Sequence, residues 1–256
     1  MRFTSSKWSL HKHYLRSPSL RAYLPPTAIL TRQSLAHYLT HYQSVYVKPD
    51  REHMGRGITR ITKVAGGYSV IRVKGRVRRF RTIRGVYRYL RAMSGKSRYI
   101  IQKTIPLAKV GGRNFDVRVM MMRNGEGNWE YAGMLAKVAG RGSVITNVMR
   151  GGGYAVKVET ALAFLPEEQR EAAIEQLKEI SYEITRHFDS YRRSSQIGID
   201  FGVDPTGQIY LIEVNYDFPS HLLFRLLQDK TYYRNIRRLV AAYSAFKKRR
   251  LQAKKK

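Results

Sequence analysis

The sequence predicts an α+β protein, in which antiparallel strand pairs alternate with helices after a helical lead-in. Apolar and polar residues alternate with a period of two in residues 68–78 and 197–201, as in half-buried strands. Tight-turn sequences, Asn-Gly at 124–125 and Asp-Pro-Thr-Gly at 204–207, separate apolar runs. An apolar stripe of helical spacing follows Pro166. Together these features favour paired strands with packed helices.

Composition limits the class of protein further. Of 256 residues, 43% are hydrophobic and 11% aromatic, which is typical of a globular chain. The absence of Cys excludes disulfides, thiolate metal sites and a cysteine nucleophile, and fits a reducing interior. No apolar run approaches the roughly 18 residues of a membrane span, and residues 1–15 lack the apolar segment of a signal peptide. We therefore expect a cytoplasmic protein.

The net charge of +30 predicts an anionic partner, because such a chain repels itself and attracts polyanions. Nucleotides, nucleic acids and acidic polymers are the candidate classes. Residues 72–98 contain eleven basic residues and no acidic one. Two interpretations of this segment remain open, a solvated face and a surface that binds an acidic polymer or nucleic acid.

The first third of the chain reads as two helices followed by a strand and a glycine loop. A short helix around residues 10–15 should end at Pro25-Pro26, and a second should be capped by Thr31 or Ser34. A strand follows at residues 45–49 and ends at Lys48-Pro49. The next loop holds Gly55, Arg56 and Gly57, where backbone N–H groups could approach a phosphate, although a plain turn also explains this pattern.

The middle of the chain is predicted to be mainly strands. We expect strands at 58–61, 68–73, 77–83, 98–105, 115–122, 129–138 and 144–146, with a helix around residues 87–93. Asp116 and Arg118 should share one strand face, as an ion pair or as site residues. Asn147 and Arg150, beside three glycines, could approach an anion, or this segment could be a flexible loop.

The last part of the chain should hold a long helix from Pro166, a hairpin at residues 197–214 and a largely helical segment at 219–246. The basic tail, residues 247–256, is expected to fray. Glu213 and Asn215 lie two apart on a strand and so share a face, and the hairpin can bring Asp200 beside them. Two carboxylates and an amide oxygen suit Mg²⁺, although an ordinary hairpin with polar ends has the same pattern.

Taken in order, these motifs resemble one family. A strand ending in Lys48, a glycine loop, the Asp116-Val117-Arg118 strand, Asn147, Gly151-Gly152 and the Glu213-Val214-Asn215 strand end occur in the order seen in the ATP-grasp superfamily. The chain is most similar to its YheC/YheD group of endospore coat-associated proteins. The resemblance covers about Lys7 to residue 245.

The resemblance implies an ATP-grasp fold, in which two α+β subdomains clasp a nucleotide cleft. Residues 1–44 would be the lead-in, 45–103 the small lid subdomain, and 104–256 the large core subdomain with its basic tail. By the same resemblance, ATP and Mg²⁺ are the cofactors, and the residues around them divide by role. Those expected at the nucleotide are Lys7, Lys48, Gly55, Arg56, Gly57, Gln102, Lys103, Ile105, Lys137 and Asn147. Arg118 and Arg150 would be catalytic, and Asp200, Glu213 and Asn215 would hold the metal.

The activity implied by the resemblance is a ligase reaction that joins an unidentified carboxylate to an amine or thiol through an acyl phosphate, with an association with the spore. The alternative is a catalytically degenerate ATP-grasp scaffold that binds polyanions or serves in the spore coat.

Two departures from the family pattern stand out. Arg51-Glu52-His53-Met54 replaces the small residues that relatives often carry, and the chain begins near the ATP-grasp core, so we expect no additional N-terminal domain.

Overall fold

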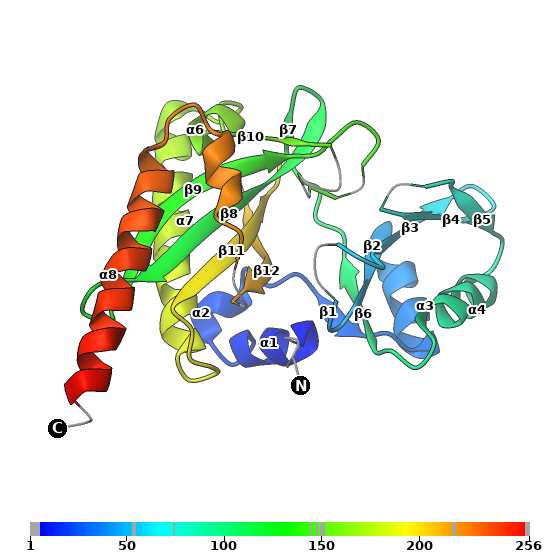
Figure 1. Cartoon of the computed structure of the whole chain (residues 1–256). Helices are drawn as coiled ribbons and strands as arrows, with labels where there is room; N and C mark the ends of the chain where they lie inside the picture. Colours follow the sequence, from blue (N-terminus) through cyan, green and yellow to red (C-terminus); the bar gives the residue numbers. More distant parts are fainter. Residues whose placement is uncertain are drawn as a thin grey trace.

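The computed structural model describes residues 6–52, 55–73, 75–143, 145–146, 148, 152–216 and 219–253. In it, two antiparallel sheets lie beside each other, each with its own hydrophobic core (Figure 1). The smaller unit is here called the lid and the larger unit the core. Among the described residues, no helix combines the length and the apolar character needed to cross a membrane.

The lid is a six-stranded sheet in the order β1-β6-β2-β3-β4-β5, covered by two helices. Its strands are β1 (Thr27–Ile29), β2 (Ser44–Pro49), β3 (Thr59–Val64), β4 (Gly67–Arg72), β5 (Arg78–Phe80) and β6 (Tyr99–Lys103). Helices α3 (Arg32–His41) and α4 (Ile83–Ser94) bury Leu35, Leu39, Val86 and Leu90 in a cluster with Val45 and Ile61 of the sheet. A capping box between Thr31 and Ser34 starts α3, so both predicted capping residues take part.

The core sheet runs in the order β10-β9-β8-β11-β12, with a short strand paired to β8. Its strands are β7 (Lys109–Val110), β8 (Arg113–Arg123), β9 (Trp129–Val138), β10 (Tyr154–Val156), β11 (Gln196–Val203) and β12 (Ile209–Asn215). The hairpins β8–β9 and β11–β12 confirm the strand pairs expected from the turn sequences. The β8 side chains alternate between the two faces of the sheet, which gives this strand two apolar sides.

Helices cover the core sheet on both faces, so this unit has three layers (Figure 1). Helix α7 (Glu167–Phe188) packs Leu177, Ile180 and Ile184 on one face, together with the short helix α6 (Val158–Ala161). Helix α8 (Thr231–Ala253) and the 3₁₀ helix η1 (Leu222–Leu226) pack on the opposite face. Within the described residues, this second cover stops short of Asp116 and Arg118 at the lid-facing end of the sheet.

The predicted lead-in is divided between the two units. Helices α1 (Lys7–Tyr14) and α2 (Pro18–Arg21) place Leu10, Tyr14 and Leu20 in the hydrophobic cluster of the core. In contrast, β1 pairs with β6 and α3 packs on the lid sheet, so residues 27–41 are built into the lid.

Four sequence predictions differ from the structure. The expected strand at 77–83 is confined to β5, because Thr82 already caps α4. Residues 145 and 146 are not a strand, since the Ser143 hydroxyl bonds to the backbone of Ile145 and forms a local turn. Pro166 is the residue before α7 rather than its first residue. The basic tail does not fray at 247–253, where α8 continues through good helix formers to Ala253.

Candidate active site

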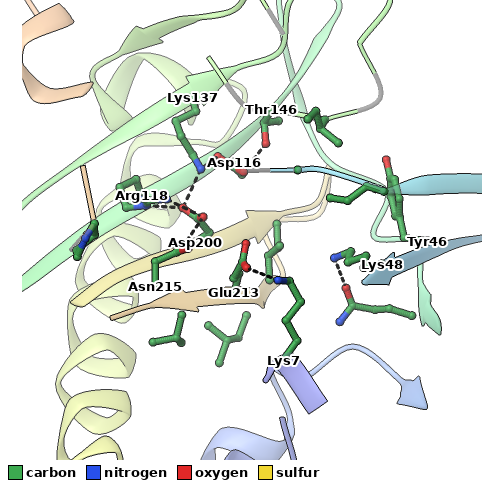
Figure 2. Close-up of a pocket in the computed structure, with 18 of the residues that line it drawn as sticks. Lys7, Tyr46, Lys48, Asp116, Arg118, Lys137, Thr146, Asp200, Glu213 and Asn215 are labelled. Carbon is green, nitrogen blue, oxygen red and sulfur yellow. Dashed lines mark hydrogen bonds and ion pairs between the residues drawn. The ribbon is translucent and has the colours of Figure 1, made fainter. Parts of the chain in front are cut away.

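A cavity of about 1010 Å³ lies between the lid and the core sheets, and charged side chains from both line it (Figure 2). Lys48 and Gln102 reach it from the lid, and Lys7 reaches it from α1. The core sheet contributes a larger set, namely Asp116, Arg118, Lys137, Asp200, Glu213 and Asn215. Residues far apart in the chain therefore meet in one cleft.

The alternation of β8 builds the floor of this cleft. Asp116, Arg118, Met120 and Met122 share one face of the strand. Met120 and Met122 pack under α8 and η1 in an apolar cluster, whereas Asp116 and Arg118 lie beyond the end of that cover and line the cleft. The same face of β8 is therefore part of a hydrophobic cluster at one end of the strand and part of the cleft at the other.

Asp200 is the centre of a buried network of charges. Its carboxylate accepts two hydrogen bonds from Arg118, from Nε at 2.6 Å and Nη2 at 2.8 Å, and one from Lys137 Nζ at 2.8 Å. Asn215 Nδ2 donates to the same group at 3.2 Å. Burial alone would raise the pKa of Asp200, but the charges of Arg118 and Lys137 outweigh it and hold this pKa well below its usual range. Asp200 is therefore ionised at neutral pH.

Asp116 shares Lys137 with Asp200, at 3.1 Å from Lys137 Nζ, and accepts a hydrogen bond from Thr146. Burial raises its pKa to about 6, with Lys137 opposing the rise and the nearby Asp200 adding to it. The structure thus pairs Asp116 with Lys137 and Arg118 with Asp200. The ion pair between Asp116 and Arg118, which was one interpretation of their spacing, is not the arrangement found.

A β-bulge turns Glu213 toward the cleft. Asp200 pairs with Glu213 across β11 and β12, whereas the next residue, Phe201, pairs with Leu211, so Ile212 is the extra residue. Without this shift, Glu213 would follow Leu211 onto the face that packs in the hydrophobic core. Instead, Glu213 forms an ion pair with Lys7 at 3.1 Å (Figure 2).

Lys7 is held in place by the buried carboxylate of Asp50, at the end of β2. This carboxylate accepts hydrogen bonds from the Ser6 hydroxyl at 3.0 Å and from the Trp8 backbone N–H at 2.9 Å. It also accepts one from Arg98 Nε at 2.9 Å. An acidic group thus accepts from one of the orphan N–H donors at the start of α1, as expected at a helix N-terminus. Lys7 is the first residue of that helix.

Lys48 faces the core from the lid. Its ammonium group donates to Gln102 Oε1 at 2.6 Å and lies 5.6 Å from the centre of the Tyr46 ring. Burial lowers the pKa of Lys48 to about 8, an effect that the charge of Glu213 opposes and that of Lys7 reinforces. The side chain is still mostly charged at pH 7.

The donor set around Asp200 is compatible with a hard cation. Among the residues that the structure describes, no cluster of three or more His, Cys, Asp or Glu side chains could hold a metal by itself. However, Asp200, Glu213 and Asn215 face the same cleft and offer two carboxylates and an amide oxygen, the donor types that Mg²⁺ prefers. Nucleotide phosphates and water usually supply the other ligands of this ion.

Exposed apolar side chains also line the cleft. Leu222 and Leu226 of η1 line it and are 57% and 53% exposed, although large apolar side chains are usually buried. Arg225 lies between them in the sequence and lines the same cavity. Exposed apolar side chains therefore share one cavity with the charged set.

The sequence comparison identifies the family to which this arrangement belongs. A model of YheC/D-like ATP-grasp proteins matches residues 2–246, nearly the whole chain. The chain belongs to the YheC/D-like ATP-grasp family. The endospore coat-associated protein YheD of Bacillus subtilis (strain 168) is 25% identical to it over 223 residues. These residues are 82% of this chain but 47% of YheD, so the chain spans about half the length of this curated relative.

Solved structures show the same fold. D-alanyl-alanine synthetase A from Vibrio cholerae matches with a TM-score of 0.54 and 17% identity, over 88% of this chain and 57% of that chain. The D-cycloserine synthetase DcsG matches with a TM-score of 0.54 and 14% identity, over 92% of this chain and 70% of that chain. The predicted ATP-grasp fold is therefore confirmed.

Most of the residues predicted for the ATP-grasp site line the cleft. They are Lys7, Lys48, Gly55, Arg56, Gln102, Arg118, Lys137, Asp200, Glu213 and Asn215. Gly57, Lys103 and Ile105 are not among the described lining residues: Lys103 lies 5.5 Å from the centre of the Tyr42 ring, and Ile105 lies against Gly202. Asn147 and Arg150 lie outside the described residues. The roles given to all of these residues stay predictions.

Three residues of the site carry no clear signal in the sequence. Thr146 acts through a hydrogen bond to Asp116, and Asp50 acts through several, all with residues distant in the chain. Gly198 leaves room for Arg118, because a Cβ atom at this position would lie 3.0 Å from Arg118 Nη1. A glycine inside a predicted strand can indicate such a close approach, so Gly198 is the one of the three residues for which the sequence holds a weak signal.

Proposed function

We propose that this chain is an ATP- and Mg²⁺-dependent ligase that joins a carboxylate to an amine or a thiol. The observation that carries the proposal is the meeting of oxygen donors and cations in one cleft between the lid and the core. Asp200, Glu213 and Asn215 offer the oxygen donors. Four cations, Lys7, Lys48, Arg118 and Lys137, surround them. This arrangement suits a triphosphate that carries a divalent cation.

The existing ion pairs define how the protein could receive such a ligand. Each carboxylate of the donor set is neutralised by a side-chain cation, Glu213 by Lys7 and Asp200 by Arg118 and Lys137. A divalent cation at Glu213 would take over the role of Lys7, whose ammonium group would then be available to a phosphate. Because the charges are exchanged rather than left unpaired, binding avoids the cost of isolated buried charges.

The chemistry needs positioning and positive charge rather than a protein nucleophile. A carboxylate oxygen of the acceptor attacks the γ-phosphorus of ATP, the bond to the β,γ-bridging oxygen breaks, and ADP leaves. An amine or thiol then attacks the acyl carbon, and inorganic phosphate leaves with the bonding electrons. Arg118 and Lys137, both buried at the floor of the cleft, are the cations proposed to stabilise the transferring phosphoryl group.

Nucleotide binding tests this proposal directly. We expect a non-hydrolysable ATP analogue with Mg²⁺ to raise the melting temperature of the protein, because a ligand of the native state stabilises it by about 2.7 kcal/mol at one hundred times its Kd. Glu213→Gln and Asn215→Ala should each weaken the affinity for the analogue in the presence of Mg²⁺ by at least about ten-fold, or about 1.4 kcal/mol. Glu130→Gln, in an exposed ion pair with Arg238, is the control. No shift at millimolar nucleotide would contradict the proposal.

A degenerate ATP-grasp scaffold is the second candidate. The same nucleotide experiment separates it from the ligase, since a scaffold releases no ADP when mixed carboxylates and amines are supplied, whether or not nucleotide stabilises it. ADP release that disappears in Arg118→Gln would support the ligase. Similarity to an endospore coat-associated protein supports a role at the spore within either proposal, and fractionation of spores with an antibody to this chain would test that role.

A further inference from the structure

The outward side of the lid carries an unusual concentration of positive charge. Residues 72–98 contain nine arginines, two lysines and no acidic residue. All of these basic side chains that the structure describes are exposed. We use the term arginine face for the members that form no ion pair within the described residues, namely Arg72, Arg76, Arg78, Arg79, Arg81, Arg84, Arg88, Arg91 and Lys96.

The arginine face has no counter-charge within the described part of the chain. Of the basic residues in this segment, Arg98 alone has an ion pair there, with Asp50. The sequence explains why. Of the 18 acidic residues, two lie in residues 1–115, and they are Asp50 and Glu52. The repulsion between neighbouring arginines is thus not relieved inside the protein, and an external polyanion would relieve it.

The fold gathers these side chains into one surface. Arg84, Arg88 and Arg91 follow helical spacing of four and three, so they lie along one side of α4. Val86 and Leu90 point the other way, into the lid cluster. Strand β5 is the edge of the lid sheet and contacts α4, with the Arg78 guanidinium 5.1 Å from the centre of the Tyr89 ring. Arginines of the strand and the helix therefore adjoin.

The arginine face is separate from the nucleotide cleft. None of its nine members is among the described residues that line the cavity between lid and core. Figure 1 shows α4, β4 and β5 at the end of the lid farthest from the core sheet. The charges of this face are therefore not explained by ATP chemistry.

The composition of the face indicates the class of partner. Its segment exposes one large apolar side chain, Val77, at 54%, whereas a folded acidic protein would usually be bound through a buried apolar centre. A polymer of regularly spaced charges needs no such anchor, because the release of counterions supplies the affinity. Arginine outnumbers lysine nine to two, and its planar group binds phosphate through two hydrogen bonds and stacks on bases.

We propose that the arginine face binds nucleic acid. This proposal goes beyond the ligase activity and does not depend on it. In a titration of the full chain with labelled single-stranded and duplex DNA of about 20 nucleotides, we expect the logarithm of the affinity to fall linearly with that of the salt concentration. The triple variant Arg84→Gln/Arg88→Gln/Arg91→Gln should bind at least about ten-fold more weakly and with a slope smaller by about 2–3.

A matched control distinguishes a site from total charge. Arg237→Gln/Lys247→Gln/Lys248→Gln removes the same three charges from exposed positions of α8. It should lower the affinity less than about three-fold. Both triple variants should unfold cooperatively at a melting temperature no lower than that of the wild type and should respond to Mg²⁺–ATP as the wild type does, which shows that they fold and that the cleft is intact. Equal losses in the two variants would overturn the proposal, as would displacement of DNA by polyglutamate of equal total charge.

Discussion

At the residue scale, Asp200 is the centre of the buried charge network and one of the proposed metal ligands. Its carboxylate compensates the charges of both Arg118 and Lys137, and all three side chains are buried. Removal of one member of a buried ion pair costs more than removal of an exposed one, because an uncompensated charge stays behind.

We predict that Asp200→Asn lowers the free energy of unfolding by about 3–5 kcal/mol. Urea denaturation followed by circular dichroism measures it. Glu130→Gln, which breaks the exposed pair with Arg238, should change the same quantity by less than about 1 kcal/mol. Losses of equal size in both variants would mean that the network around Asp200 contributes no more than a surface ion pair.

Lys48 should make nucleotide binding dependent on pH. Burial lowers the pKa of its ammonium group to about 8 in the folded protein, so its charge is lost as the pH rises through that value. We predict several-fold weaker binding of ATP at about pH 9 than at about pH 7, and Lys48→Arg should remove most of the change because a guanidinium stays charged. Isothermal titration calorimetry at the two pH values provides the test. An equal decline in the arginine variant would assign the effect to another group.

The contribution of Lys48 to folding stability changes with pH in the opposite direction to its contribution to ATP binding. Its pKa of about 8 in the folded state is below the unfolded value of about 10.4, so the unfolded chain binds more protons between these two pH values. The contribution of Lys48 to stability therefore rises with pH across this window. Below about pH 8 the cost of its buried charge is fully present.

At this scale, the sequence predicts which residues share a strand face but not which residues they contact. The spacing of Glu213 and Asn215, and their hairpin with Asp200, placed these three residues together correctly on one face. The partners of Asp200 could not be predicted, because Lys137 comes from another hairpin. The alternation of side chains along a strand gives the face of each residue but not the residue with which it forms an ion pair. Thr146 and Asp50 were missed for the same reason.

At the element scale, α1 depends on a residue of the lid. Asp50 accepts from the Ser6 hydroxyl and from the Trp8 backbone N–H, and so orders the first turn of this helix. We predict that Asp50→Ala costs about 1–3 kcal/mol of stability and speeds amide exchange in the first turn of α1. Hydrogen exchange read by mass spectrometry would show the change in this helix.

The turn between β11 and β12 provides the control for the Asp50 experiment. Asp204 accepts hydrogen bonds from the backbone N–H groups of Thr206 and Gln208 in the β11–β12 turn. Asp204→Ala should speed exchange in that hairpin and leave α1 unchanged. If Asp50→Ala left exchange in α1 at the wild-type rate, the carboxylate of Asp50 would not be what holds the helix.

Elements were predictable wherever a regular pattern continued to their ends. The β8–β9 and β11–β12 hairpins, α4 and α7 follow from alternation, turn sequences and apolar stripes. The bulge at Ile212 could not be foreseen, since a strict period of two puts Leu211 and Glu213 on the same face. The length of α8 was also missed, because its last turns are exposed and highly charged, although each residue favours a helix.

At the scale of the whole molecule, the charge of +30 should make stability depend on salt. Like charges on the lid repel each other in the folded state, and dissolved ions screen exposed charges over a distance of about 10 Å at 0.1 M. We predict that raising sodium chloride from about 50 to 500 mM increases the melting temperature of the wild type. The gain should be smaller in Arg84→Gln/Arg88→Gln/Arg91→Gln, as measured by differential scanning calorimetry. A melting temperature that falls with salt would contradict this prediction.

Helix α1 has a consequence for how the two units move. Its side chains Leu10 and Tyr14 are anchored in the core, whereas its N-terminus is fastened to Asp50 of the lid. Any swing that separates the two sheets must pull on these contacts, so the helix sets an upper limit to the amplitude of hinge motion. Since Lys7 is carried on the same turn, the degree of opening and the position of this ammonium group change together.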